Sequence, residues 1–197
     1  MADYLVVGGS RGLGQQVAGH LRKCGHTVHT MQRTPSEEEM DTATWHRVDF
    51  TDPATAVNAV REVLELPSFE RFQGVFFAPC LHTVQPVELI SQYDLQAAYM
   101  VNVAGPVMLL TYLWTYDLVD KDSRAVFMLD ERPLDETHLP YVLTKAGLKP
   151  AVEAWGRAYG FPVPVLFTHK PEKVGEEELG VMEHVLSAHY HPPGGMI

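Results

Sequence analysis

Cysteine is scarce in this chain, with two in 197 residues, Cys24 and Cys80. Two cysteines cannot build the disulfide framework that holds small secreted domains together. We expect both to be reduced and buried among apolar side chains. No spacing of metal ligands runs through them, and the alternating His189 and His191 lack a third ligand, so we expect no metal.

Long apolar runs are lacking as well. The run Tyr4–Val7 is too short for the core of a signal peptide and has no basic flank. The densest apolar stretch, Gly105–Trp114, is interrupted by polar residues and proline, and no 18 consecutive residues are apolar. We therefore expect a soluble, cytoplasmic protein with no membrane partner.

Basic residues are outnumbered: 15 Lys and Arg face 25 Asp and Glu, a net charge of −10. This balance argues against nucleic acid as a partner, and local basic groups must hold any anionic ligand. Apolar residues make up 46% and charged ones 20%, which is a globular composition. At roughly 150 residues per domain, we expect residues 1–197 to form one domain.

Short apolar runs alternate with stretches of helical periodicity along the whole chain, which predicts a doubly wound parallel α/β sheet, Rossmann-like, with helices on both faces. The acidic runs Glu37–Glu39 and Glu176–Glu178 are typical of solvated surfaces. The expected strands are Tyr4–Val7, His26–Met31, Thr44–Val48, Gly74–Ala78, Ala125–Leu129 and Pro162–Phe167. The expected helices follow the first strand through Leu21, start at Pro53, and span Tyr93–Tyr116, Tyr141–Tyr159 and Glu177–His189.

A glycine-rich turn follows the first strand directly. Its spacing, with glycine at positions 8, 9, 12 and 14, differs from the common dinucleotide fingerprint. Glycines at such a turn let the backbone approach a pyrophosphate, whose charge then lies at the N-terminus of a helix. An ordinary strand-to-helix turn is the alternative, but the position directly after the first buried strand favours a dinucleotide.

The end of the second strand indicates which dinucleotide. NAD-binding proteins place an acidic residue there to hold the ribose hydroxyls. Here Arg33 and Thr34 occupy this place, and Arg11 lies in the glycine turn. A guanidinium binds phosphate through two hydrogen bonds, so both arginines suit the 2′-phosphate of NADP(H).

Tyr141 and Lys145 lie four residues apart at the start of a helix that follows Pro140. This spacing puts the phenol and the ammonium on one helical face. A nearby positive charge favours the phenolate, which suits proton transfer. Lys145 could also hold a ribose hydroxyl.

With these features the chain resembles the short-chain dehydrogenases/reductases over about residues 3–168. The resemblance implies that Asp49 and Phe50 contact adenine, that Asn102 helps position the lysine through water, and that Tyr141 and Lys145 are the catalytic pair. It also implies a cofactor loop made of Gly8, Ser10, Arg11, Gly12, Leu13 and Gly14. The segment Gly194–Ile197 looks like the start of the family's last strand.

The departures from this family lie on the substrate side. Phe76-Phe77-Ala78-Pro79 stands where the family has Asn-Asn-Ala-Gly, so backbone contact of Ala78 and Pro79 with the nicotinamide-side ribose could persist without the side-chain support. No serine follows the fifth strand before Tyr141, and Thr137 lies too near the tyrosine to replace it. An ionised Asp130 would repel a developing oxyanion. The segment that covers the substrate, around residues 171–177, is shortened.

Three functions remain open. The first is an NADP(H)-dependent reductase of a small-molecule or carrier-bound carbonyl, with Tyr141 as proton donor. The second is a non-catalytic NADP(H)-binding sensor or partner subunit. The missing serine, the lost Asn-Asn-Ala-Gly segment and the shortened substrate-covering segment favour it. The third is dehydratase or isomerase chemistry with Tyr141 as base. The open site, and an apolar stripe on the Asn102 helix that is equally consistent with packing on the sheet, suggest a homodimer or higher homo-oligomer.

Overall fold

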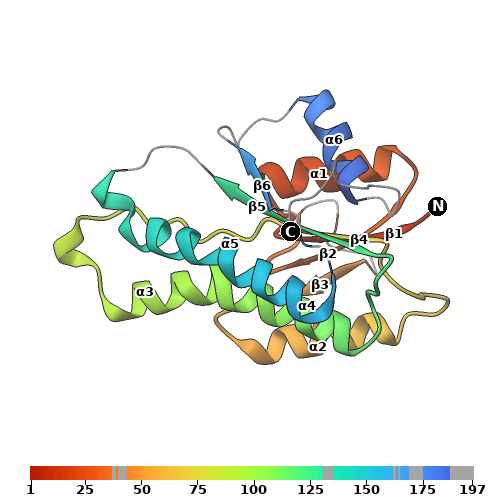
Figure 1. Cartoon of the computed structure of the whole chain (residues 1–197), viewed down its shortest axis with the longest axis horizontal. Coiled ribbons are helices and arrows are strands. Elements are labelled where there is room, and N and C mark those ends of the chain that lie inside the picture. The colour runs from red at the N-terminus through yellow and green to blue at the C-terminus, as the bar shows by residue number, and fades with distance from the viewer. Residues whose placement is uncertain are drawn as a thin grey trace.

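A six-stranded parallel sheet forms the centre of the molecule in the computed structural model (Figure 1). The structure describes residues 1–36, 39, 44–130, 135–161, 163, 165–168 and 175–186. The strand order β3-β2-β1-β4-β5-β6 reverses between β1 and β4, and doubly wound sheets bind their ligands at such a point. The strands are β1 Asp3–Val7, β2 Thr27–Gln32, β3 Trp45–Arg47, β4 Gly74–Phe77, β5 Arg124–Asp130 and β6 Val165–Thr168.

Helices cover both faces of this sheet, as expected. In Figure 1, α1 (Gly12–Lys23) and α6 (Glu176–Leu186) lie on one face. On the other face lie α2 (Pro53–Leu64), α4 (Gly105–Thr115) and α5 (Leu139–Tyr159). Each face has its own core, because residues of opposite parity along the buried strands point to opposite sides. The predicted fold class is confirmed.

The helix expected over Tyr93–Tyr116 consists of three segments, α3 (Gln92–Tyr99), a π-helical turn η3 (Met100–Ala104) and α4. Pro106 has no N–H to donate to the carbonyl four residues earlier, and the N–H of Gly105 bonds instead to Met100, five residues back. A Cβ at Gly105 would lie 2.4 Å from the ring of Phe50. Glycine therefore lets this helix approach the segment after β3.

Length and composition alone would let the helix Gln92–Thr115 cross a membrane, with a mean hydropathy of 1.3. Core helices of soluble proteins pass the same test. Here the α4 part packs against α2 and α5, and Leu109, Leu110 and Leu113 are fully buried. Packing inside the domain accounts for its apolar character.

Two sequence predictions about burial are wrong. Cys24 and Cys80 are exposed, because Cys24 follows the last turn of α1 and Cys80 lies in the loop beyond β4. Glu39, expected on a solvated surface, is 2% exposed, because Arg22, Gln32 and Ser36 surround its carboxylate with hydrogen bonds. The shortened segment at residues 171–174, the histidines 189 and 191 and the strand expected at 194–197 lie outside the described residues.

Candidate functional site

The glycine turn joins β1 to α1 at the carboxyl edge of the sheet. Gly8 has a φ of +85°, which side chains disfavour, and its N–H bonds to the carbonyl of Met31. A Cβ at Gly14 would lie 2.1 Å from the carbonyl oxygen of Gly8. Helix α1 therefore starts in direct contact with the turn, which only glycine at position 14 permits.

The N-terminus of α1 faces the same space. Among the described residues no side chain caps this helix, and its first turn holds no acidic residue. The free N–H groups and the positive end of the helix dipole are the elements of an anion site. In contrast, Asp52 caps α2 by accepting from the N–H of Ala54.

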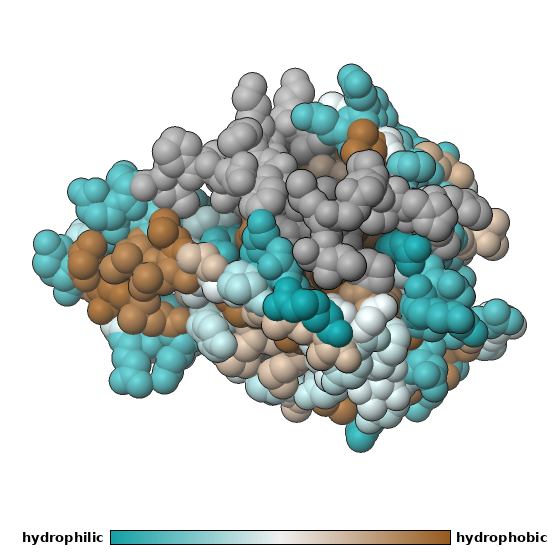
Figure 2. All heavy atoms as spheres, in the orientation of Figure 1, coloured by the Kyte–Doolittle hydropathy of each residue, from teal (hydrophilic) through white to brown (hydrophobic). Residues whose placement is uncertain are grey.

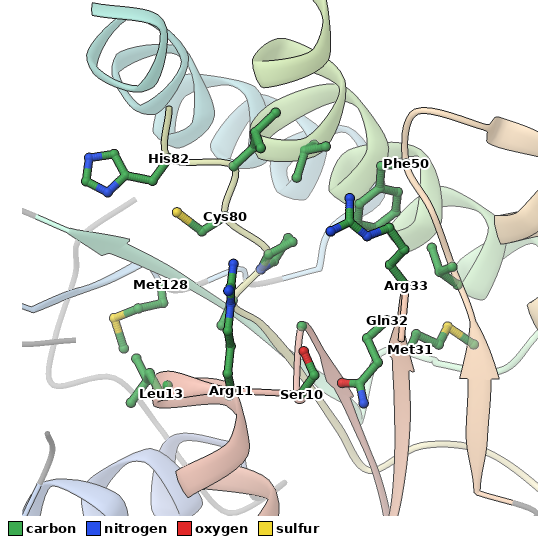
Figure 3. Close-up of a pocket in the computed structure, with 18 of the residues that line it drawn as sticks. Ser10, Arg11, Leu13, Met31, Gln32, Arg33, Phe50, Cys80, His82 and Met128 are labelled. Carbon is green, nitrogen blue, oxygen red and sulfur yellow. The ribbon is translucent and has the colours of Figure 1, made fainter. Parts of the chain in front are cut away.

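Two arginines reach into this space from different elements. Figure 3 shows Arg11 rising from the glycine turn and Arg33 from the end of β2. Asp49 lies nearby. Burial raises the pKa of Asp49, but hydrogen bonds from Thr51 and the charges of Arg33 and Arg47 outweigh it, so the pKa is lowered and the carboxylate is ionised. Asp49 and Arg33 thus form a polar end of the cavity.

A buried brace behind Arg33 was not expected from the sequence. Gln32, the last residue of β2, lines the cavity and donates from Nε2 to Glu39 at 2.6 Å. Glu39 also accepts from Arg22 of α1 at 2.9 Å and from the hydroxyl of Ser36 at 2.7 Å. This network ties the end of β2, beside Arg33, to helix α1.

Tyr141 and Lys145 lie on one face of α5, at the opposite end of the cavity. Tyr141 is 2% exposed, and the ammonium of Lys145 lies 5.3 Å from the centre of its ring. Lys145 donates to the carbonyl of Met128 on β5 at 3.3 Å. The strand that ends beside the cavity therefore holds the lysine next to the tyrosine.

Asn102 does not line the cavity but supports its wall. Its Oδ1 accepts from the N–H of Leu81 at 2.7 Å, and its Nδ2 donates to the carbonyl of Leu81 at 3.1 Å. The same Nδ2 donates to the hydroxyl of Thr144 at 3.0 Å. Asn102 thus joins the loop after β4 to the residue preceding Lys145, and it is a positioning residue.

His82 and Cys80 are wall residues that sequence reasoning missed. The ring of His82 lies 4.6 Å from that of Tyr141 and 4.8 Å from that of His138, measured between centres. Both His82 and Cys80 are exposed to the cavity and visible in Figure 3. The sequence signal that could have indicated their role was their position directly after Phe76-Phe77-Ala78-Pro79, the segment that departs from the family pattern.

Thr137 does not take the place of the missing serine. It lies in the short helix η4 (Glu136–His138), where its hydroxyl donates to the carboxylate of Asp135. The side chain of Asp130 and residues 131–134 lie outside what the structure describes. Lys145 and the ring of His82 are among the described groups that lie beside Tyr141.

The glycine turn, the two arginines and the tyrosine–lysine pair border one continuous cavity of about 600 Å³. The cavity runs from the glycine turn and Arg33 to Tyr141 and Lys145. Its volume is in the range of small-molecule binding sites. Every residue predicted for the site except Asn102 lines it: Gly8, Ser10, Arg11, Gly12, Leu13, Gly14, Arg33, Thr34, Asp49, Phe50, Ala78, Pro79, Tyr141 and Lys145.

The cavity fits a phosphorylated dinucleotide on structural grounds. A Cβ at Gly14 would close the cradle, the N-terminus of α1 is uncapped among the described residues, and guanidinium groups lie beside it. Phe50 offers an aromatic face near Arg33 (Figure 3).

Solved structures of other proteins share the fold of this chain. A carbonyl reductase from Pseudomonas aeruginosa superimposes with a TM-score of 0.73 at 22% identity, over 94% of this chain and 90% of that one. A Serratia marcescens short-chain dehydrogenase/reductase variant gives 0.75 at 19% identity, over 96% and 92%. A Burkholderia multivorans protein of this kind, solved with bound NADP, gives 0.71 at 20%, over 94% and 90%.

A sequence relative has been curated as well. It is the benzil reductase ((S)-benzoin forming) of Bacillus subtilis, 28% identical over 112 residues. The match covers 55% of this chain and 46% of the relative, so it spans about half of that protein's length. No family model matches the chain. In its strand order, its glycine turn and its tyrosine–lysine pair, the chain resembles the short-chain dehydrogenases/reductases.

Proposed function

We propose that the protein is an NADP(H)-dependent reductase of a carbonyl compound. The observation that carries this proposal is the single cavity that joins an uncapped helix N-terminus and two arginines to the Tyr141–Lys145 pair. The curated relative bears the name of a reductase, and a structural neighbour binds NADP. Both point to the same class.

Each end of the cavity would have its own task. The glycine turn and the N–H groups of α1 would hold the pyrophosphate, and Arg11 and Arg33 the 2′-phosphate. Asp49 would accept from the adenine amine, and Lys145 would hold a ribose hydroxyl. When bound, NADPH supplies the hydride.

Tyr141 would give the proton from its hydroxyl to the oxygen of the substrate. The ammonium of Lys145 lies close enough to stabilise the resulting phenolate. The hydrogen bonds of Asn102 would hold the Leu81 backbone and α5 in a fixed relative position, so that Tyr141 faces the substrate in one orientation. In this arrangement one general acid serves the reaction without the family's serine.

The test is oxidation of NADPH against a panel of aldehydes, ketones, quinones and 1,2-diketones, benzil among them. We expect at least one class to be reduced, with a rate that depends on Tyr141. A rate unchanged in Tyr141→Phe would overturn the proposal. The missing serine predicts a parent rate lower by about 10²–10³-fold than that of a complete site.

A second candidate function is NADP(H) binding without catalysis. It is favoured by the phenylalanines that end β4 where the family has asparagines, and by the absence of a serine between Leu129 and Tyr141 in the sequence. It predicts tight NADPH binding with no turnover of any carbonyl, and an affinity insensitive to Tyr141→Phe. The same panel separates the two functions.

Assembly into a dimer is part of the proposal. Large apolar side chains are exposed close to where α3 and α5 begin, and Figure 2 shows a brown cluster at this end of the molecule. The stripe considered from sequence contributes little, since Val103 and Leu110 are buried in the core. Light scattering at micromolar concentration should give the mass of a dimer or more. The exposed residues are Val84, Val87, Leu89, Tyr93, Val142 and Leu143.

A further inference from the structure

Metal-binding side chains meet at the edge of the molecule where α6 packs against α1, among residues that take no part in the cofactor cavity. His20 lies on α1, Cys24 directly after it, and His26 just before β2. Glu183 comes from α6, more than 150 residues later in the chain. Figure 1 shows α6 lying beside α1. The sequence separation explains why no motif was visible.

The distances between these groups match a tetrahedral metal site. The Nε2 atom of His20 lies 2.9 Å from Oε2 of Glu183 and 3.7 Å from Sγ of Cys24, and that Sγ lies 3.5 Å from the same Oε2. Zinc binds such ligands at about 2.0–2.3 Å, which places neighbouring ligands roughly 3.3–3.8 Å apart in a tetrahedron. One ion would fit among the three atoms with shifts of a few tenths of an ångström.

Two further groups surround these ligands. Nε2 of His26 lies 3.4 Å from the other oxygen of Glu183 and helps to hold its carboxylate. Nδ1 of His20, on the far side of its ring, lies 3.5 Å from Oε2 of Glu176. A carboxylate behind a ligating histidine fixes the ring and its tautomer, as in many zinc sites.

We propose that His20, Cys24 and Glu183 bind Zn²⁺, with the fourth position open to water, and fasten α6 to α1. Nitrogen, sulfur and oxygen ligands in one tetrahedral set favour Zn²⁺ over Mg²⁺ or Ca²⁺, which prefer oxygen alone. On binding, the sulfur–zinc bond replaces the thiol S–H bond, and the proton goes to solvent. Cys24 is exposed, so the ion can enter from water.

The test uses the full chain, freed of any affinity tag and stripped with a chelator. Zn²⁺ is titrated in competition with a chromophoric chelator, and Co²⁺ is added separately as a spectroscopic probe. We expect one Zn²⁺ per chain with a dissociation constant below about 1 μM. We also expect a sulfur-to-cobalt charge-transfer band and a melting temperature that rises by about 5 °C or more in excess zinc.

Matched variants decide the outcome. Cys24→Ser should abolish the charge-transfer band and weaken zinc binding at least tenfold, whereas Cys80→Ser should keep both. In the parent, zinc should slow alkylation of Cys24 but not of Cys80, a readout that needs no variant to fold. Stoichiometric zinc that is unaffected by Cys24→Ser and Glu183→Gln, or no binding below about 10 μM, would overturn the proposal.

Discussion

The two ends of the cavity differ in how closely they follow the family that the chain resembles. At the phosphate end, the glycine turn, the start of α1 and the arginines are in place, and Gly14 touches the turn so closely that no other residue fits. At the carbonyl end, the tyrosine and lysine are kept, but the sequence has no serine between β5 and Tyr141, and a histidine lies against the tyrosine. The comparison teaches that the half of the cavity proposed to bind the cofactor and the half proposed to handle the substrate can differ independently within one fold.

The largest expected effect comes from a substitution that disrupts the phosphate end of the cavity. Gly14→Ala places a Cβ only 2.1 Å from the carbonyl oxygen of Gly8, so α1 must move away from the turn. We expect NADPH affinity to fall by more than about 100-fold, with a lower melting temperature. Gly19→Ala on the same helix meets nothing within 4 Å and should behave like the parent. Normal NADPH binding by Gly14→Ala would show that this contact does not shape the site.

The next effect concerns the carbonyl end alone. Tyr141→Phe removes a hydroxyl that serves mainly the transition state, so turnover should fall by at least ~10²-fold while NADPH affinity stays nearly intact. Lys145→Ala should damage both, because the ammonium has two tasks. Steady-state kinetics and a binding titration separate these outcomes. Tyr159→Phe, at the far end of α5, is the matched control and should change neither quantity.

A smaller effect sharpens the choice of cofactor. Arg33→Ala should weaken NADPH binding by roughly ten- to 100-fold, because a charge-assisted phosphate contact is worth about 1.5–3 kcal/mol. NADH affinity should barely change, since NADH lacks that phosphate. Arg61→Ala removes the same charge from the exposed face of α2 and controls for net charge. Equal loss for both cofactors would contradict the assignment.

The smallest effect lies outside both ends, on β2. Burial, and then the neighbouring His46, lower the pKa of His29 from 6.5 to about 4. The unfolded chain takes up this proton as the pH falls below about 6.5, whereas the folded chain does so only near 4. Stability is therefore fully present above pH 6.5 and falls between 6.5 and 4, by about 1–2 kcal/mol at pH 5.

Urea unfolding at pH 7.5 and pH 5 measures this effect. His29→Gln removes the titrating group and should reduce the difference between the two pH values, even if the variant is less stable at both. A difference of the same size in the variant would assign the loss to other groups.

The sequence predicted the elements well because β1, β4, β5 and β6 are short apolar runs and the helices carry their own periodicity. The phosphate end was equally visible, since the glycine turn and α1 are contiguous in the chain. What escaped prediction depends on residues distant in sequence. Glu39 is buried only because Arg22, Gln32 and Ser36 converge on it, and Cys24 lies beside Glu183 only once α6 has docked.

The wall around Tyr141 and Lys145 escaped prediction for a related reason. His82 was unremarkable in the sequence, and only the loop after β4, held by Asn102, brings it against Tyr141. The π-helical turn likewise follows from the proline at 106 inside an otherwise regular helix. Local sequence patterns predict the helices and strands, whereas the wall of the cavity depends on contacts between them.

The central claim is that a working NADP(H) site persists beside an altered carbonyl end. The most direct measurement is a fluorescence titration of the parent protein with NADPH and with NADH. The account predicts saturable 1:1 binding of NADPH that is at least about tenfold tighter than that of NADH. Binding of neither cofactor, or of both with equal affinity, would contradict it.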